Sequence, residues 1–228
     1  MSRQQTRFDP RSIARLIVQL ILLAAILFLS AGTIRWTMGW VVIGLYTIVM
    51  LATIHFIQVD RAFLAQRTKI DSATKGWDKT IAWMLRFISP LGILVVAGTE
   101  FRFSSSWELS ASIKVIGLLV TILGYGLGIW ATSSNPFYAG YVRIDEEQDV
   151  VNAGPYAYIR HPGYAGSILV QIGLPVVLGS MWASLLGIFG AVLVVIRTHL
   201  EDRTLIHELP GYDQYANRVR SRLFPGIY

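Results

Sequence analysis

Long apolar runs recur along this chain of 228 residues, and they restrict its fold more than any other feature. Residues 16–34 and 36–59 contain no Lys, Arg, Asp or Glu. Two further runs cover residues 80–99, which are interrupted by Arg86, and residues 115–142. A helix needs about 20 apolar residues to cross a hydrocarbon core of about 30 Å. With 54% hydrophobic and 15% charged residues, the sequence predicts an all-α integral membrane protein.

The last apolar run, residues 164–196, contains no charged residue and is too long for one straight membrane helix. Such a helix would reach about 50 Å, whereas two complete spans need about forty residues. We therefore expect a tight helical hairpin with a kinked first arm to about residue 178 and a second arm over about 181–200, which makes six membrane helices. Residues that break helices are available at Gly173, Pro175, Gly179 and Ser180.

The basic residues predict how the chain is oriented. If the N-terminus lies inside the cell, sixteen of the twenty Lys and Arg residues lie in cytoplasmic segments and three in outer loops. This bias follows the positive-inside rule and places both termini in the cytoplasm. The twentieth, Arg86, either extends to the membrane interface or binds an anionic acceptor.

Several functional classes are excluded or disfavoured. The chain has no cysteine, so it has no disulfide, thiolate metal site or cysteine nucleophile. The four histidines show no metal-ligand spacing, and we expect no metal. There is no Gly-x-Gly-x-x-Gly loop for a Rossmann domain. The net charge of +6 comes from loops between apolar runs, which favours anionic lipid headgroups over nucleic acid.

Residues 154–166, with the sequence GPYAYIRHPGYAG, form a polar and irregular segment at the mouth of the last apolar run. The prolines and glycines indicate turns and allow close approach of the backbone to a ligand. A belt of Tyr and Arg anchoring a helix end is the structural alternative. The density of turn residues around His161 favours a binding site.

The last apolar run ends at Arg197, followed by Glu201 and Asp202. Arg197 and Glu201 are four residues apart and share a helix face. An intrahelical ion pair at the membrane boundary is the simplest interpretation of this spacing.

Residues 160–166, RHPGYAG, resemble the Arg-His-Pro-x-Tyr-x-Gly signature of the isoprenylcysteine carboxyl methyltransferase family, to which phospholipid methyltransferases are related. The resemblance extends from about residue 135 to the C-terminus. It includes the family's Arg-x-x-x-Glu-Glu pattern, in which Asp202 replaces the second Glu here, and its aromatic and basic ending, matched over residues 209–225. That ending also has the composition of an amphipathic helix lying on a membrane.

The resemblance implies a site for S-adenosylmethionine. Aromatic faces attract its sulfonium, and carboxylates hold its ammonium group. Arg197 corresponds to the residue that anchors the acceptor, and with Glu201 it is expected to be catalytic. Tyr158 and, through a family Gln position, Tyr141 are further candidates. The donor contacts implied by the family fall on Gln148, Asp149, Val150, Val151, Tyr156, His161, Pro162, Gly163, Tyr164 and Glu201.

Together these features predict a membrane region over residues 1–133 and a catalytic region over residues 134–228, with a cytoplasmic cofactor site. The expected activity is methyl transfer from S-adenosylmethionine to a lipophilic acceptor among membrane lipids, such as the carboxylate of an isoprenylcysteine. Three alternatives remain open: methylation of a phospholipid amine or small thiol, an NADPH-dependent reductase of the sterol-reductase type, and a non-catalytic membrane scaffold.

Overall fold

A computed structural model describes residues 10–56, 74–103, 109–144 and 148–228, and this part of the chain is helical, with no strand. It confirms the expected all-α class. The polar stretch at residues 60–79, which contains five of the basic residues assigned to the cytoplasmic side, lies mostly outside the described residues. The long elements are α1 (Pro10–Ala31), α2 (Thr37–Phe56), α4 (Gly76–Trp83), α5 (Ser89–Phe103), α6 (Ala111–Ser134), α7 (Pro162–Leu178) and α8 (Met181–Glu208). Three short elements complete the set: a π-helical turn (Met84–Ile88), a 3₁₀ turn (Gly154–Ala157) and α9 (Tyr212–Arg218).

Five helical stretches in the described residues are long and apolar enough to cross a membrane, judged by length and composition. They are α1, α2, the continuous helix Gly76–Phe103, α6 and α8. Helix α7 is apolar but has only 17 residues. The sixth span expected from the sequence therefore stays a prediction.

The continuous helix Gly76–Phe103 is longer than the apolar run at residues 80–99 suggested. Beyond this run, α5 continues through Glu100 to Phe103. The reason lies in the N-terminus of α8, where unpaired backbone N–H groups need acceptors. The Glu100 carboxylate accepts hydrogen bonds from the Met181 and Trp182 amides, at 3.3 and 3.1 Å, and from the Ser180 hydroxyl. Glu100 is thus kept on the helix by capping α8.

Small residues bring α6 and α7 close together. A Cβ added at Gly166 would lie 2.5 Å from the Gly124 carbonyl oxygen, and one at Gly124 would lie 2.6 Å from the Gly166 carbonyl oxygen. Backbones can approach this closely only where side chains are absent, as in other membrane helix pairs. Helices α7 and α8 are joined by Gly179, whose φ of 75° suits glycine, and by Ser180.

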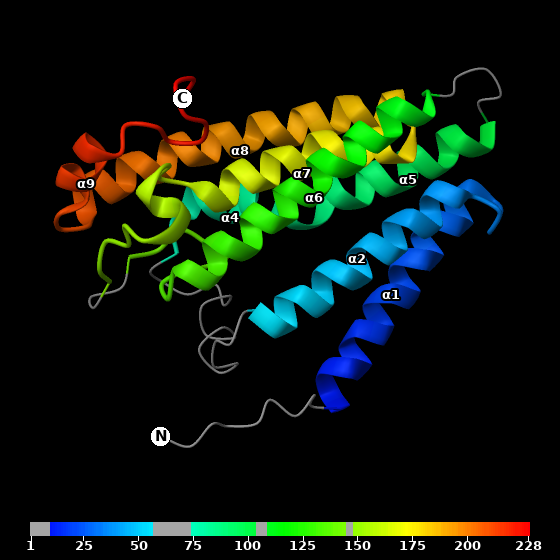
Figure 1. Cartoon of the computed structure of the whole chain (residues 1–228), viewed down its shortest axis with the longest axis horizontal. Coiled ribbons are helices and arrows are strands. Elements are labelled where there is room, and N and C mark those ends of the chain that lie inside the picture. Colours follow the sequence, from blue (N-terminus) through cyan, green and yellow to red (C-terminus); the bar gives the residue numbers. More distant parts are fainter. Residues whose placement is uncertain (1–9, 57–73, 104–108, 145–147) are drawn as a thin grey trace.

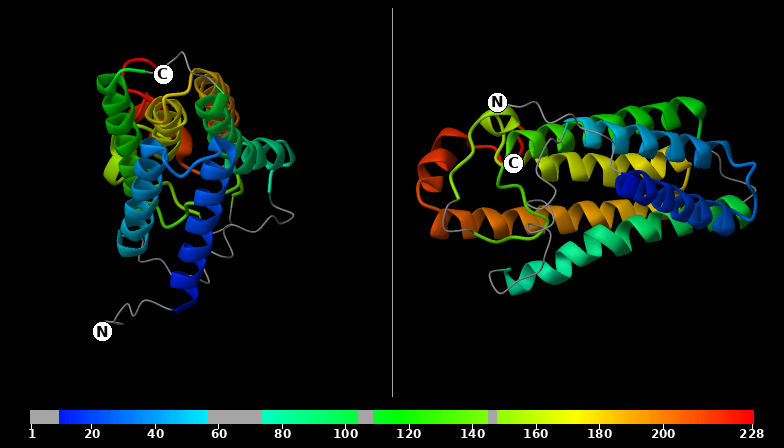
Figure 2. Two further views of the ribbon diagram at one scale, coloured as in Figure 1. Left: turned by 90° about the vertical axis from the view of Figure 1, so that its right-hand side faces the viewer. Right: turned by 90° about the horizontal axis from the view of Figure 1, so that it is seen from below.

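The polar segments gather at one end of the bundle (Figure 1). The irregular segment after α6, the 3₁₀ turn, α9 and the C-terminus all lie at the same end of α6, α7 and α8. Helices α1 and α2 lie to one side of this bundle (Figure 2). The arrangement brings the irregular segment, the start of α7 and the last turns of α8 together, and the candidate site lies among them.

Candidate functional site

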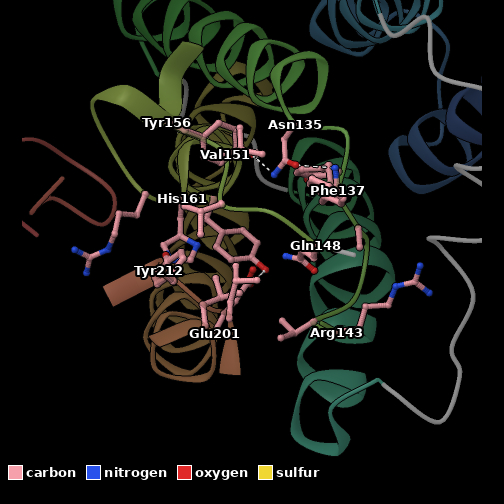
Figure 3. A pocket seen from close by; sticks show the side chains of 18 of the residues that line it. Asn135, Phe137, Arg143, Gln148, Val151, Tyr156, His161, Glu201 and Tyr212 are labelled. Carbon is pink, nitrogen blue, oxygen red and sulfur yellow. Dashed lines mark hydrogen bonds between the residues drawn. The ribbon is translucent and has the colours of Figure 1, made fainter. Parts of the chain in front are cut away.

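A cavity lies between the segment that follows α6, the start of α7 and the last turns of α8 (Figure 3). Its empty space, including a part open to solvent, measures about 930 Å³. The cavity is lined by aromatic rings, by backbone of the irregular segment and by a few charged side chains.

Nine of the ten residues expected to contact a methyl donor line this cavity, and so does Arg197. The exception is Pro162, which is buried in the first turn of α7. A proline is well tolerated there, because a backbone N–H at the start of a helix has no partner within the helix. Tyr158 was also a candidate, but its side chain is 69% exposed and does not line the cavity. Tyr141 does line it. The nine are Gln148, Asp149, Val150, Val151, Tyr156, His161, Gly163, Tyr164 and Glu201.

Glu201 presents a carboxylate to the cavity. The Tyr164 hydroxyl donates a hydrogen bond to its Oε2 atom. Within the described part of the chain, its other oxygen accepts no hydrogen bond. The Tyr164 ring in turn stacks on His161, with ring centroids 5.7 Å apart and an interplanar angle of 8°. The carboxylate is therefore oriented from one side and has an oxygen left for a cationic ligand.

Asp202 has a different position from its neighbour Glu201. Its side chain is fully buried and accepts bonds from Arg160 Nε at 2.8 Å and Arg160 Nη2 at 2.7 Å. It also accepts from the Tyr212 hydroxyl at 3.1 Å and from Arg222 Nε at 2.7 Å, and the His161 Nε2 atom lies 3.2 Å away. A carboxylate buried this deeply requires such partners. Asp202, which replaces the second Glu of the family pattern, is the centre of a buried ionic network.

Arg160 links this network to the C-terminal tail. Besides its two bonds to Asp202, it donates through Nη1 to the Val219 carbonyl at 2.9 Å. The backbone N–H groups of Arg160 and His161 donate to the Ser221 and Arg222 carbonyls, at 3.0 and 2.9 Å. The signature segment thus holds the tail against α8, so its arginine has a structural task.

Arg197 and Glu201 do not form the intrahelical ion pair that their spacing suggested. Arg197 donates instead to Asp78 of α4, through Nε at 2.6 Å and Nη2 at 2.9 Å. Its Cζ atom also lies 5.1 Å from the centroid of the Tyr164 ring. The two side chains therefore have separate partners. Asp78 was missed because it lies about 120 residues away in a segment that showed no pattern.

Asn135 and Tyr138 are further cavity residues that the sequence did not reveal. The Asn135 Oδ1 atom accepts a hydrogen bond from the Phe137 amide at 2.7 Å, and its Nδ2 atom donates to the Tyr156 hydroxyl at 3.3 Å. A Cβ at Gly163 would lie 3.2 Å from the Tyr138 ring, so this glycine allows the ring to pack against α7. Both residues help to shape the aromatic wall.

Three phenols beside the cavity, Tyr156, Tyr212 and Tyr215, stay neutral at ordinary pH. Burial raises the pKa of Tyr156, and burial together with the Asp202 carboxylate raises the pKa of Tyr212. Burial likewise raises the pKa of Tyr215 to about 12. These side chains offer aromatic faces and hydrogen bonds, and they are unsuited to act as bases. Among the described residues, no group of three or more His, Asp or Glu side chains could hold a metal ion.

Residues 115–207 match the model of the isoprenylcysteine carboxyl methyltransferase (ICMT) family. This region belongs to that family. It contains α7, most of α8 and the irregular segment that lines the cavity, including Tyr164, Arg197 and Glu201. The family match over this region and the five apolar helices support an integral membrane protein and a methyltransferase.

Two curated relatives resemble the chain more loosely. One is a protein named nickel-cobalt-cadmium resistance protein NccN from Alcaligenes xylosoxydans xylosoxydans, 26% identical over 141 residues, which are 61% of this chain and 62% of the relative. The other is an uncharacterized protein, YpbQ, from Bacillus subtilis (strain 168), 32% identical over 103 residues, which are 44% of this chain and 58% of the relative. The matches span less than two thirds of the length of either relative, and neither name identifies an ICMT substrate.

Proposed function

We propose that the protein is an integral membrane methyltransferase that uses S-adenosylmethionine to methylate an amphiphilic acceptor at the cytoplasmic interface. The acceptor favoured by the family is the carboxylate of an isoprenylcysteine or a similar lipophilic molecule. The observation that carries the proposal is the position of Glu201. A carboxylate oriented by Tyr164, with one oxygen unengaged, lines a cavity walled by aromatic rings inside the family region.

The residues around the cavity fit the chemistry of this donor, which supplies a methyl group activated by a sulfonium. Glu201 would hold the ammonium group through a charge-assisted hydrogen bond. The faces of Tyr156 and Tyr164 would attract the sulfonium by cation–π interaction. The irregular backbone at residues 148–151 has N–H and C=O groups outside any helix and would hold the polar ends of the donor.

The catalytic task of the protein is mainly alignment. An acceptor that is already anionic needs no general base, and the neutral phenols around the cavity supply none. Holding donor and acceptor in one geometry removes much of the entropic barrier. Arg197, which lines the same cavity as Glu201, would orient the acceptor head, while the acceptor tail would lie among the apolar helices.

The reductase alternative is disfavoured by the charges in the cavity. NADPH carries several phosphate charges, which require free cationic groups. Of the arginines that line the cavity, Arg160 and Arg197 are each bound to a fully buried aspartate. Each therefore has few donors left for a ligand: Nη1 of Arg197 would suffice for one acceptor carboxylate, but not for the several phosphate charges of NADPH. Methylation of a phospholipid amine or a small thiol is the second candidate. Glu201 and the aromatic wall of the cavity would bind the donor in the same way whichever atom accepts the methyl group.

Incubation of the purified protein with labelled S-adenosylmethionine and a membrane extract tests the proposal. We expect label in a lipid-soluble fraction, and base-labile release of that label would identify a carboxyl methyl ester. Label that resists base would favour an amine or thiol acceptor. Absence of transfer to any fraction would contradict the proposed activity.

A further inference from the structure

The first turn of α4 contacts the cavity wall and α8 at the same point. Asp78, in this turn, is fully buried. Its Oδ1 atom accepts from Arg197 Nε at 2.6 Å, and its Oδ2 atom accepts from Arg197 Nη2 at 2.9 Å and from the Val142 amide at 2.7 Å. One carboxylate therefore joins the guanidinium of α8 to the irregular segment that lines the cavity.

These bonds fix both Arg197 and the wall beside it. Arg197 Nη2 also donates to the Gly140 carbonyl at 3.0 Å, and Gly140 and Val142 both line the cavity. The two-pronged edge of the guanidinium, Nε with Nη2, is thus occupied within the protein. The Nη1 atom takes part in none of these bonds. Arg197 in this geometry offers an acceptor one nitrogen instead of a bidentate edge.

A second ion pair between the same helices differs in its surroundings. Lys75 Nζ lies 2.7 Å from Glu208 Oε2, and the two side chains are 30% and 46% exposed. This pair lies near the end of α8, and neither side chain lines the cavity. Loss of this exposed pair removes a charge contact between the start of α4 and α8 away from the cavity, and exposed pairs contribute little to stability. A Lys75 variant therefore controls for loss of a charge contact at this junction that does not involve Arg197.

We propose that Asp78 is a positioning residue for acceptor binding, which holds Arg197 and the wall at residues 140–142 so that the guanidinium meets the acceptor through Nη1. The part that concerns the acceptor rests on the proposed methyltransferase function. Asp78 lies outside residues 115–207, the region matched by the family, so the site is completed by the preceding part of the chain.

The positioning is tested without any activity assay by hydrogen–deuterium exchange in detergent. We expect Asp78→Ala to speed exchange of the amides at residues 140–142 by about tenfold or more, because local opening becomes easier when the Val142 bond is lost. Asp78→Asn, which keeps the side-chain volume, is the second variant if the alanine protein does not fold. Lys75→Gln should change these amides less than about twofold. Unchanged exchange in the Asp78 variants would overturn the proposal, whether or not the protein proves to be a methyltransferase.

The effect on the acceptor is tested by a double-mutant cycle with N-acetyl-S-farnesylcysteine and labelled S-adenosylmethionine. If Asp78 acts through Arg197, Asp78→Asn and Arg197→Lys should each lower kcat/KM for the acceptor by about tenfold, and the double variant should be no worse than Arg197→Lys alone. The dissociation constant of the donor should stay within about twofold of the parent. Effects that multiply in the double variant, or a parallel loss of donor affinity, would contradict the proposal. A parent protein that binds no donor would instead refute the proposed function, and the exchange result would still decide the role of Asp78.

Discussion

Glu201 and Asp202 are consecutive residues of α8 with different surroundings: Glu201 lines the cavity, whereas Asp202 is fully buried beneath it. Consecutive residues of an α-helix point about 100° apart, so one helix can supply both a binding group and a structural one. Tyr164 is the partner of Glu201, and Arg160 is the two-pronged partner of Asp202. This division predicts opposite phenotypes for the two carboxylates.

Asp202→Asn should destabilise the fold. It removes the charge that compensates Arg160 and Arg222 in a buried network, and loss of one partner of a buried pair typically costs about 3–5 kcal/mol. Thermal unfolding in detergent would measure this as a clear drop in Tm relative to the parent. A variant that melts at the parental temperature would show that the network contributes little.

Glu201→Gln should weaken donor binding while the fold stays intact. The substitution keeps the shape of the side chain but removes the charge-assisted bond to a cationic ligand, worth about 1.5–3 kcal/mol, or about tenfold to a hundredfold in affinity. Calorimetric titration with S-adenosylmethionine measures the affinity, with Tm as the stability control. Arg197→Lys is the comparison variant, expected to bind donor normally. Equal affinities for Glu201→Gln and the parent would remove Glu201 from the donor site.

Tyr215 should make stability fall at high pH. Its hydroxyl donates to the Tyr156 carbonyl at 2.7 Å, and its pKa is about 12 in the folded protein against an ordinary value of 10.0. The stabilisation is complete below about pH 10 and is lost as the pH rises toward about 12, because only the unfolded phenol ionises in that window. Between pH 8 and 11.5, the parent should lose Tm faster than Tyr215→Phe. Parallel curves for the two proteins would contradict this assignment.

Both termini should lie in the cytoplasm, together with the cavity. The prediction rests on the excess of basic residues in the segments assigned inside, sixteen against three. A pair of reporters fused after Tyr228, one active only in the cytoplasm and the other only outside it, measures the orientation. We expect activity from the cytoplasmic reporter alone, and the reverse pattern would place the cavity on the other face.

The class of fold could be predicted because lipid imposes strong rules on sequence. Long runs without charge indicate helices, and the break predicted near Gly179 falls where α7 ends. The exact ends of the helices were harder to predict from the sequence. The extension of α5 past Glu100 depends on a capping contact with α8, which is 80 residues distant in the sequence.

The candidate site could be predicted where its residues lie close together in the sequence. The segment around His161 and the last turns of α8 carry recognisable patterns, and the structure brings them to one cavity. The partners of the arginines were not predictable, since Asp78 and Arg197 are joined only by the tertiary fold. Likewise, nothing in the order of Glu201 and Asp202 reveals which of them is turned toward Arg160.

Calorimetric titration of the purified parent protein with S-adenosylmethionine, and in parallel with NADPH, distinguishes a methyltransferase from a reductase. We expect saturable binding of S-adenosylmethionine and of its demethylated product, and no binding of NADPH. Binding of NADPH without measurable affinity for S-adenosylmethionine would contradict the proposed function and would favour a membrane reductase.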